Sequence, residues 1–352
     1  MKILYGVPGE GMGHATRAKV ILSHLSKNHD LRIVSSDNAY YFLKNIFPDK
    51  TYEIKGFQFS YRDGVVSKSK TSIDILRNAP ENIVINFKKY KDLLDDFRPD
   101  IVISDFESFT YLFAKYHRLP IISIDNMQII DRGKLDMQIP ESEKTNYKIA
   151  KAVIKAKVPN CNQYLISSFF DIEVKKRNSV LVPPIIRREI LEAKTEVGNH
   201  ILIYQSSSNA EKIVNILQSL SGENFLLYGF NKEEKIGNVQ LKQFSETEFI
   251  DNFRTAKAVL ANGGYSFISE ALFLKKPICV VPIKNQFEQY ANAAYIQKLG
   301  YGAMLKDFEL NGIKSFLTDI PKFRKALDRY AQKDNNMLFS VLDEKLVEYC
   351  KK

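Results

Sequence analysis

Residues 262–272 read Asn262-Gly263-Gly264-Tyr265-Ser266-Phe267-Ile268-Ser269-Glu270-Ala271-Leu272, directly after an apolar run at 258–261. The two glycines end this expected strand and open an expected helix, whose first backbone N–H groups can bind phosphate. The carboxylate of Glu270 can accept hydrogen bonds from ribose hydroxyl groups. This order suits the diphosphate and ribose of a nucleotide sugar, and an ordinary strand, turn and helix at the surface is the alternative.

A second polar cluster follows Pro282 and reads Glu288-Gln289-Tyr290-Ala291-Asn292-Ala293. An acid and an amide in this arrangement can hold sugar hydroxyl groups. Together the two clusters resemble the donor-binding segment of inverting GT-B glycosyltransferases of the peptidoglycan GlcNAc transferase, plant and antibiotic types. The resemblance implies that the donor is bound by Gly263, Gly264, Ser266, Glu270, Glu288, Gln289 and Asn292.

Apolar runs alternate with helical patterns along the whole chain, whose 352 residues suffice for two domains. Expected strands lie at 2–7, 31–35, 101–104, 121–125, 164–167 and 180–182, and then at 201–205, 225–228, 239–243, 258–261 and 278–281. Runs of this kind between helices predict parallel sheets covered on both faces, an α/β fold.

The best candidate for a linker is the run 181–185, in which Pro183 and Pro184 exclude both a helix and a central strand. We therefore expect an N-terminal acceptor-side domain at 1–182 and a donor domain at 183–335. The last residues have a helical pattern. The GT-B resemblance implies that a helix at 336–352 crosses back onto the first domain.

A glycine-rich loop, Gly9-Glu10-Gly11-Met12-Gly13-His14, follows the first expected strand and enters a helix expected at 14–27. Its spacing matches neither the G-x-G-x-x-G dinucleotide pattern nor a phosphate-binding Walker loop. Ligands of open parallel sheets bind beyond the carboxyl ends of the strands, where Gly13 and His14 lie. A helix N-terminus favours a neutral imidazole, so His14 is a candidate general base. The alternative is a histidine that caps its helix or fills a turn.

Asp105 ends the apolar run 101–104, which places it at the same edge of the sheet. In the plant-type enzymes an aspartate at this strand end orients the catalytic histidine, so the resemblance gives that role to Asp105. Glu107 is expected as a helper base or as a ligand of the acceptor hydroxyl. Capping of the following helix is the alternative for both acids.

The pattern Gly-x-Gly-His-x-x-Arg, ending at Arg17, also resembles an uncharacterised archaeal and bacterial GT-B group associated with teichoic-acid biosynthesis. That likeness implies a cell-envelope polysaccharide such as teichoic acid or a capsule, with Arg17 on the acceptor side. Ser206 and Ser207, after the strand expected at 201–205, can donate to the diphosphate. Phe244 is expected either to stack on the nucleobase or to lie in the core.

Retaining GT-B enzymes carry a second glutamate eight residues from the ribose-binding one, and here those positions are Asn262 and Ile278. We therefore expect inversion, with His14 deprotonating an acceptor hydroxyl. The sequence has no Asp-x-Asp motif, so we expect neither a metal nor a cofactor beyond the nucleotide-sugar donor, a UDP-sugar by resemblance. A nucleotide-sugar hydrolase or 2-epimerase on the same fold and a non-catalytic binding module are the alternatives.

The formal net charge is +10, yet no nucleic-acid motif accompanies it, so nucleic acid is not an expected partner. Within 144–157 the chain has no acid and forms a basic amphipathic helix pattern with Lys144, Lys148, Lys151 and Lys155. This pattern indicates either a solvated surface helix or docking on anionic lipid.

No apolar run approaches 20 residues, no signal-peptide layout is present, and three scattered cysteines form no disulfide framework. We expect a cytoplasmic protein, peripheral on the inner face of the plasma membrane if the basic helix binds lipid.

Overall fold

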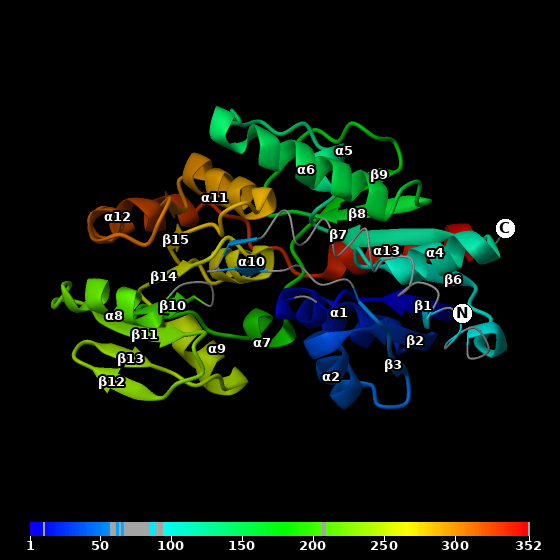
Figure 1. The fold of residues 1–352 in the computed structure, drawn as a ribbon, viewed down its shortest axis with the longest axis horizontal. Coiled ribbons are helices and arrows are strands. Elements are labelled where there is room, and N and C mark those ends of the chain that lie inside the picture. Colours follow the sequence, from blue (N-terminus) through cyan, green and yellow to red (C-terminus); the bar gives the residue numbers. More distant parts are fainter. Residues whose placement is uncertain are drawn as a thin grey trace. The chain divides into compact units, whose positions relative to one another are not determined.

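The computed structural model describes residues 1–9, 11–56, 61–62, 65–66, 85–86, 88, 90, 94–205 and 209–350. The chain divides into two units (Figure 1). Unit 1 comprises Met1–Ser60, Ser67–Ile185 and Asp334–Lys352, and unit 2 comprises Tyr61–Val66 and Ile186–Lys333. The main division follows Ile185, three residues after the expected end of the first domain.

The sheet of unit 1 has seven parallel strands in the order β3-β2-β1-β6-β7-β8-β9. Their bounds are β1 Lys2–Gly6, β2 Asp30–Ser35, β3 Thr51–Glu53, β6 Ile101–Ser104, β7 Ile121–Asp125, β8 Gln163–Ser167 and β9 Ser179–Val182. The strand order reverses at β1, which lies between β2 and β6. The carboxyl ends of β1 and β6 therefore form the switch point at which an open α/β sheet binds ligands.

Within the described residues the helices of unit 1 are α1 Met12–Leu25, α2 Asp37–Ile46, α4 Ser108–His117, α5 Ile129–Arg132, α6 Glu141–Lys157 and α13 Asn336–Cys350. The helix expected at 14–27 is present as α1, and its residues Ala18, Ile21, Leu22 and Leu25 are all buried in the core of this unit. This packing fixes the first turn of α1 at the end of β1.

The C-terminal helix α13 belongs to unit 1, as the GT-B resemblance implies. Its residues Leu338, Leu342 and Leu346 are buried in the same core as α1. At its surface, His24 Nε2 lies 3.0 Å from each carboxylate oxygen of Asp343. The final segment of the chain is therefore packed and hydrogen-bonded onto the domain that begins it.

The sheet of unit 2 has the order β12-β13-β11-β10-β14-β15-β16, with only β12 antiparallel to its neighbour. The strands are β10 His200–Tyr204, β11 Asn224–Tyr228, β12 Glu234–Ile236, β13 Val239–Leu241, β14 Ala258–Ala261, β15 Ile278–Val280 and β16 Gly302–Met304. The helices are α7 Arg188–Leu191, α8 Ala210–Gln218, α9 Glu246–Thr255, α10 Tyr265–Phe273, α11 Phe287–Leu299 and α12 Leu310–Leu327. A two-stranded ribbon pairs β4 Tyr61–Arg62 with β5 Val65–Val66. The predicted α/β class is confirmed for both units.

Candidate active site

The switch point of unit 1 brings His14 and Asp105 together. His14 lies in the first turn of α1, and Asp105 directly follows β6, where its N–H donates to the carbonyl oxygen of Gly6 at 2.9 Å. A Cβ atom added at Gly6 would come within 2.2 Å of Thr110 Oγ1, so only glycine allows this close approach. Phe106 turns the chain away with a φ of 59°, an unfavourable value for a bulky residue.

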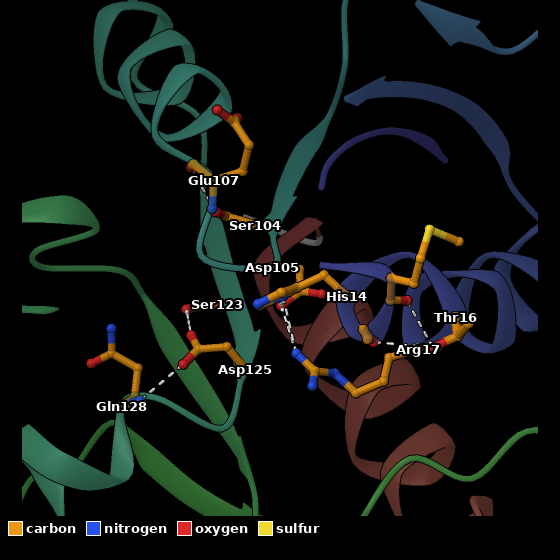
Figure 2. A network of polar contacts seen from close by, with 11 residues as sticks. His14, Thr16, Arg17, Ser104, Asp105, Glu107, Ser123, Asp125 and Gln128 are labelled. Atoms are coloured by element: carbon orange, nitrogen blue, oxygen red, sulfur yellow. Dashed lines mark hydrogen bonds and ion pairs between the residues drawn. The ribbon is translucent and has the colours of Figure 1, made fainter. Parts of the chain in front are cut away.

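The imidazole of His14 contacts both a carboxylate and a guanidinium (Figure 2). Its Nδ1 lies 2.9 Å from Asp105 Oδ1 and 3.0 Å from Arg17 Nη2. These contacts cannot both be hydrogen bonds, because the first needs a proton on Nδ1 and the second a lone pair. We assign the proton to Nδ1, since the buried anion of Asp105 is the stronger acceptor. Nε2 then carries a lone pair and can act as a base.

Asp105 stays ionised in this setting. Burial raises the pKa of Asp105, but the charges and hydrogen bonds of His14 and Arg17 outweigh it, so the pKa lies below its ordinary value. Arg17 Nη2 lies 3.5 Å from Asp105 Oδ1, and its guanidinium is itself buried. Arg17, expected on the acceptor side, therefore contacts the histidine–aspartate pair. A fixed carboxylate of this kind holds the imidazole in one orientation and stabilises imidazolium.

Asp125 is a buried acid that the sequence reasoning did not assign to the site. It ends β7, beside β6, and accepts hydrogen bonds from Gln128 N at 2.9 Å and Ser123 Oγ at 2.8 Å. Burial raises the pKa of Asp125 to about 6, and the nearby charge of Asp105 adds to this effect. Because ligands of an open parallel sheet bind beyond the carboxyl ends of its strands, the sequence offered the same signal for Asp125 as for Asp105.

Glu107 caps helix α4. Its Oε1 accepts from Phe109 N at 2.7 Å, and its Oε2 accepts from Thr110 N at 2.7 Å and from Thr110 Oγ1 at 2.8 Å. The side chain extends away from His14 and Asp105 (Figure 2). The capping alternative therefore describes Glu107, and we give it no part in the chemistry.

In unit 2 the glycine turn after β14 is held by the second polar cluster. Gln289 Oε1 accepts from Gly263 N at 2.9 Å and from Ile283 N at 3.0 Å, while Asn292 Nδ2 donates to Gly263 O at 2.9 Å. Both lone pairs of the Gln289 carbonyl oxygen are thus used within the protein. Gln289, expected with Glu288 to hold sugar hydroxyl groups, and Asn292, expected to bind the donor, thus hold the glycine turn in place.

The two glycines of the turn differ in their surroundings. A Cβ atom added at Gly263 would lie 2.5 Å from the carbonyl oxygen of Gln289, whereas one added at Gly264 would meet nothing within 4 Å. Gly264 precedes α10, and Ser266 and Glu270 lie on that helix. Glu288 is half-buried in the first turn of α11.

Two further expectations concern the loops after β10 and β13. Ser206 and Ser207 lie outside the described residues. Phe244 is 57% exposed and touches Phe249 at a ring distance of 5.5 Å, so the expectation that it lies in the core is wrong. An exposed aromatic ring in the loop between β13 and α9 is available for stacking.

Arg187 is a site residue that the sequence reasoning missed. Its Nε lies 2.6 Å from Glu270 Oε1 and its Nη2 lies 2.7 Å from Glu270 Oε2, a bidentate pair in which both residues are buried. Burial lowers the pKa of Arg187, but Glu270 and Glu246 together raise it above its ordinary value. The only signal in the sequence is an arginine two residues after the linker 181–185.

Gln205 is a second residue that the sequence reasoning missed. It directly follows β10, the strand at which the strand order of the unit 2 sheet reverses. It is 1% exposed, and neither its Oε1 nor its Nε2 has a hydrogen-bond partner among the described residues. A buried amide without a partner among the described residues costs free energy of folding.

Helix α6 displays its basic residues beside exposed apolar ones. Ile149 is 44% exposed and Val153 is 36% exposed, while the helix buries Asn146 and Ile154. The same helix carries four lysines that share another side of it, of which Lys144 pairs with Glu141, Lys155 approaches Asp131, and Lys151 donates to Tyr147. No described helix is long and apolar enough to cross a membrane. The described part of the chain also contains no group of three His, Cys, Asp or Glu residues that could hold a metal ion.

Comparisons with known proteins identify the family and the fold. The model of the family described as Glycosyl transferase family 1 matches residues 1–321. An uncharacterized glycosyltransferase of Methanosarcina acetivorans is 24% identical over 334 residues, which cover 87% of this chain and 86% of the relative. A UDP-N-acetylglucosamine–N-acetylmuramyl-(pentapeptide) pyrophosphoryl-undecaprenol N-acetylglucosamine transferase of Clostridium kluyveri is 28% identical over 184 residues, 46% of this chain and 52% of that protein.

Among solved structures, UGT2 of Phytolacca americana, in complex with UDP-2fluoro-glucose and pterostilbene, has a TM-score of 0.69 to this chain. The match covers 100% of both chains at 12% identity. At that identity the likeness shows the fold alone, and the fold is GT-B.

Proposed function

We propose that this chain, which belongs to glycosyl transferase family 1 and is a glycosyltransferase of the GT-B fold, is an inverting, metal-independent enzyme. It would move a sugar from a UDP-sugar to a hydroxyl group of a cell-surface glycopolymer or a lipid-linked acceptor. The observation that carries this proposal is the contact of 2.9 Å between His14 Nδ1 and Asp105 Oδ1 at the switch point of unit 1.

The proposed reaction is a direct displacement. Nε2 of His14 takes the proton of the acceptor hydroxyl as its oxygen attacks the anomeric carbon, and the bond from that carbon to the nucleoside diphosphate breaks. The configuration at the anomeric carbon is thereby inverted. Asp105 stabilises the imidazolium that forms. General-base catalysis of this kind contributes roughly 10²–10⁴-fold to a rate.

The glycine turn of unit 2 supports the departure of the nucleoside diphosphate. The N-terminus of α10, held open by Gly263 and Gly264, offers backbone N–H groups to phosphate oxygens. Inversion is supported by the absence of a second glutamate eight residues before or after Glu270. One position is Asn262, whose amide donates to Val281 O at 3.2 Å, and the other is the buried Ile278.

A UDP-sugar donor and a lipid-linked acceptor are supported by the relatives. The Clostridium kluyveri protein is named for transfer from UDP-N-acetylglucosamine to a pyrophosphoryl-undecaprenol acceptor. The Phytolacca americana structure holds a UDP-sugar analogue. In this chain Glu270 provides a carboxylate for the ribose diol, and Phe244 provides an exposed ring for the base.

The test is a transfer assay with purified protein, a panel of nucleotide sugars and lipid extracts or polysaccharide fragments as acceptors. Differential scanning fluorimetry with nucleoside diphosphates first identifies the base. We expect stabilisation by UDP that is lost in Glu270→Ala, and an acceptor-dependent product of inverted configuration that is lost in His14→Ala. Free sugar released without an acceptor would instead indicate a hydrolase, in which the same histidine activates water. No stabilisation by any nucleotide would refute the transferase proposal.

We propose also that α6 docks the protein on an anionic membrane surface. Ile149 and Val153 are exposed on one side of α6, and at 3.6 residues per turn Lys144, Lys148, Lys151 and Lys155 share another side. A helix that exposes both apolar and basic side chains fits the headgroup region of a bilayer. Sedimentation with vesicles of phosphatidylglycerol or of phosphatidylcholine tests this. We expect binding to the anionic vesicles only.

Ile149→Asp and Lys148→Glu should each reduce the bound fraction, whereas Lys322→Glu, on the exposed surface of α12, should not. Equal binding of Ile149→Asp and the unmodified chain would rule out docking through α6.

A further inference from the structure

One oxygen atom of Asp105 faces two nitrogen atoms that can carry positive charge. Its Oδ1 lies 2.9 Å from Nδ1 of His14 and 3.5 Å from Nη2 of Arg17. The two nitrogen atoms are 3.0 Å apart, a close approach that follows when two donors converge on a single acceptor. Asp105 is 2% exposed and Arg17 is 4% exposed, whereas the side chain of His14 is 19% exposed. The aspartate and the arginine are therefore fixed inside the fold, and the imidazole is the most exposed member of the group.

A buried carboxylate needs a cation beside it to stay ionised. Two groups could supply that charge to Asp105. One is the guanidinium of Arg17, which keeps its proton at any pH at which a protein is folded, and the other is the imidazole of His14 after it has taken up a proton. The choice decides whether His14 can act as a base. An imidazolium ion carries a proton on both nitrogen atoms, so it has no lone pair for the proton of an acceptor hydroxyl group.

We propose that Arg17 is a positioning residue that acts as the permanent counter-ion of Asp105 and thereby keeps His14 neutral near pH 7. This inference rests on the proposed function, in which His14 is the general base. Asp105 can then orient the imidazole through its hydrogen bond without holding it as a permanent imidazolium ion. A general base is most effective when it gains its proton near the working pH, and the charge of Arg17 provides this match. An arginine with a merely structural role would not affect the pH at which His14 takes up a proton.

Two further ionisable side chains interact electrostatically with this group. Asp125, at the end of β7, interacts with both Asp105 and His14, and burial raises its pKa to about 6. Tyr5, on β1, interacts with Asp105 and Arg17, and burial raises its pKa well above the ordinary value, so its phenol is uncharged near pH 7. Asp125 gains its charge in the pH range in which a histidine titrates. Its contribution must therefore be removed by substitution when the effect of Arg17 is measured.

The experiment follows the protonation of His14 by ¹⁵N NMR of protein labelled in its histidine side chains. The chain has five histidines, and His14→Gln identifies the signals of His14. The unmodified chain at pH 7 should show a neutral imidazole with its proton on Nδ1. In Arg17→Gln the same signals should report imidazolium at pH 7, and the midpoint of the titration should lie about 1–3 pH units higher, the effect of one charge at this distance. Arg17→Met carries the same expectation and replaces Arg17→Gln if that variant does not fold.

The pH profile of sugar transfer gives a second readout. On the acidic side of the profile kcat/KM falls as the general base takes up a proton. In Arg17→Gln this acidic limb should move to higher pH together with the NMR titration. Since a limb of unit slope loses tenfold for each pH unit of displacement, kcat/KM at pH 6.5 should fall about tenfold or more and recover at alkaline pH. Arg17→Lys retains a positive charge and should keep most of the activity at pH 6.5.

Three control variants separate this charge effect from a general disturbance of the fold. Arg32→Gln removes another, more exposed arginine of unit 1 and should leave the titration of His14 unchanged. When Arg17→Gln is combined with Asp105→Asn the anion is gone as well, so His14 should again be neutral at pH 7. The displacement caused by Arg17→Gln should persist when Asp125→Asn is added, which separates it from the titration of Asp125.

The possible results distinguish the inference from the proposed function. If Arg17→Gln leaves both the NMR titration and the acidic limb in place, or moves them to lower pH, the role of Arg17 is refuted while the transferase proposal stands. Imidazolium at pH 7 in the unmodified chain refutes the inference without any variant. If the titration moves as expected but the unmodified chain transfers no sugar, the proposed function fails and the pairing of Arg17 with Asp105 as counter-ions remains.

Discussion

Nδ1 of His14 lies 2.9 Å from Oδ1 of Asp105, although 91 residues separate them in the chain. The contact arises because β1 and β6 are adjacent and parallel, so that the residues after both strands meet at one edge of the sheet. If this contact selects the tautomer of a catalytic base, removing the charge of Asp105 should matter more for rate than for binding.

Asp105→Asn should lower kcat by roughly 10²–10⁴-fold, because an amide can stabilise the wrong tautomer and no longer balances imidazolium. The KM for the donor should change little, since Asp105 acts in the proposed reaction through His14 on the proton of the acceptor hydroxyl. Steady-state kinetics of this variant beside His14→Ala measure both constants. An Asp105→Asn enzyme with unchanged kcat would show that the pair is structural.

Glu107→Ala should lower stability while leaving the chemical step intact. The substitution leaves the N–H groups of Phe109 and Thr110 without their acceptor in a buried place, at a cost of about 2 kcal/mol or more. Thermal unfolding and kcat below the melting temperature test this. A large fall in kcat at an unchanged melting temperature would mean that Glu107 acts as a helper base.

The histidine–aspartate pair could be predicted from the sequence, and the role of Glu107 could not. Both acids follow the same apolar run. The end of a predicted strand locates the backbone of the residues that follow it, but not the direction of their side chains. Whether a carboxylate faces a ligand or caps the next helix depends on the turn at Phe106. The φ of 59° at this residue cannot be predicted from the sequence, because phenylalanine seldom adopts a positive φ.

In unit 2 the resemblance located the glycine turn, but it could not show that Gln289 and Asn292 hold that turn. Arg187 was missed because its partner lies 83 residues away. Strands β3, β12 and β16 were missed because they lie at the edges of their sheets and bury few side chains, whereas the equally short β13 and β15 lie inside the sheet and have apolar, buried runs.

Asp125→Asn should stabilise unit 1 at neutral pH. The ordinary pKa of 3.8 is raised to about 6 in the fold, so a protonated carboxyl stabilises the protein below about pH 4 and that contribution is lost as pH rises through about 6. The ionised form then costs about 3 kcal/mol, which the amide avoids.

Urea unfolding of Asp125→Asn at pH 7.5 and pH 4.5 provides the measurement, and the advantage of the variant should shrink at the lower pH. Asp131→Asn is the matched control, because Asp131 is equally a buried aspartate of unit 1 but pairs with Lys176. It should be destabilised at pH 7.5. An advantage for Asp125→Asn that is independent of pH would contradict the assignment.

Gln205→Met should raise stability and weaken donor binding together. Methionine has a similar volume and removes the two unpaired amide atoms, each of which costs about 1–3 kcal/mol when buried. If the amide hydrogen-bonds to a polar group of the bound donor, the same substitution also removes that contact. Melting temperatures with and without nucleoside diphosphate separate the two effects. Lower stability without ligand would mean that Gln205 is not an unpaired group.

Gly263→Ala and Gly264→Ala should have different consequences, although the residues are neighbours. An alanine Cβ at 263 would lie 2.5 Å from the backbone oxygen of Gln289, so the turn must move and both stability and nucleotide binding should fall. At 264 the same atom would meet no protein atom within 4 Å, so Gly264→Ala should fold as well as the unmodified chain. The space beside Gly264 is then free for a ligand, and a methyl group there should weaken nucleotide binding alone. Melting temperature and calorimetric affinity, measured on both variants, test the contrast. If Gly264→Ala binds nucleoside diphosphate with unchanged affinity, the phosphates do not approach the N-terminus of α10 at this residue.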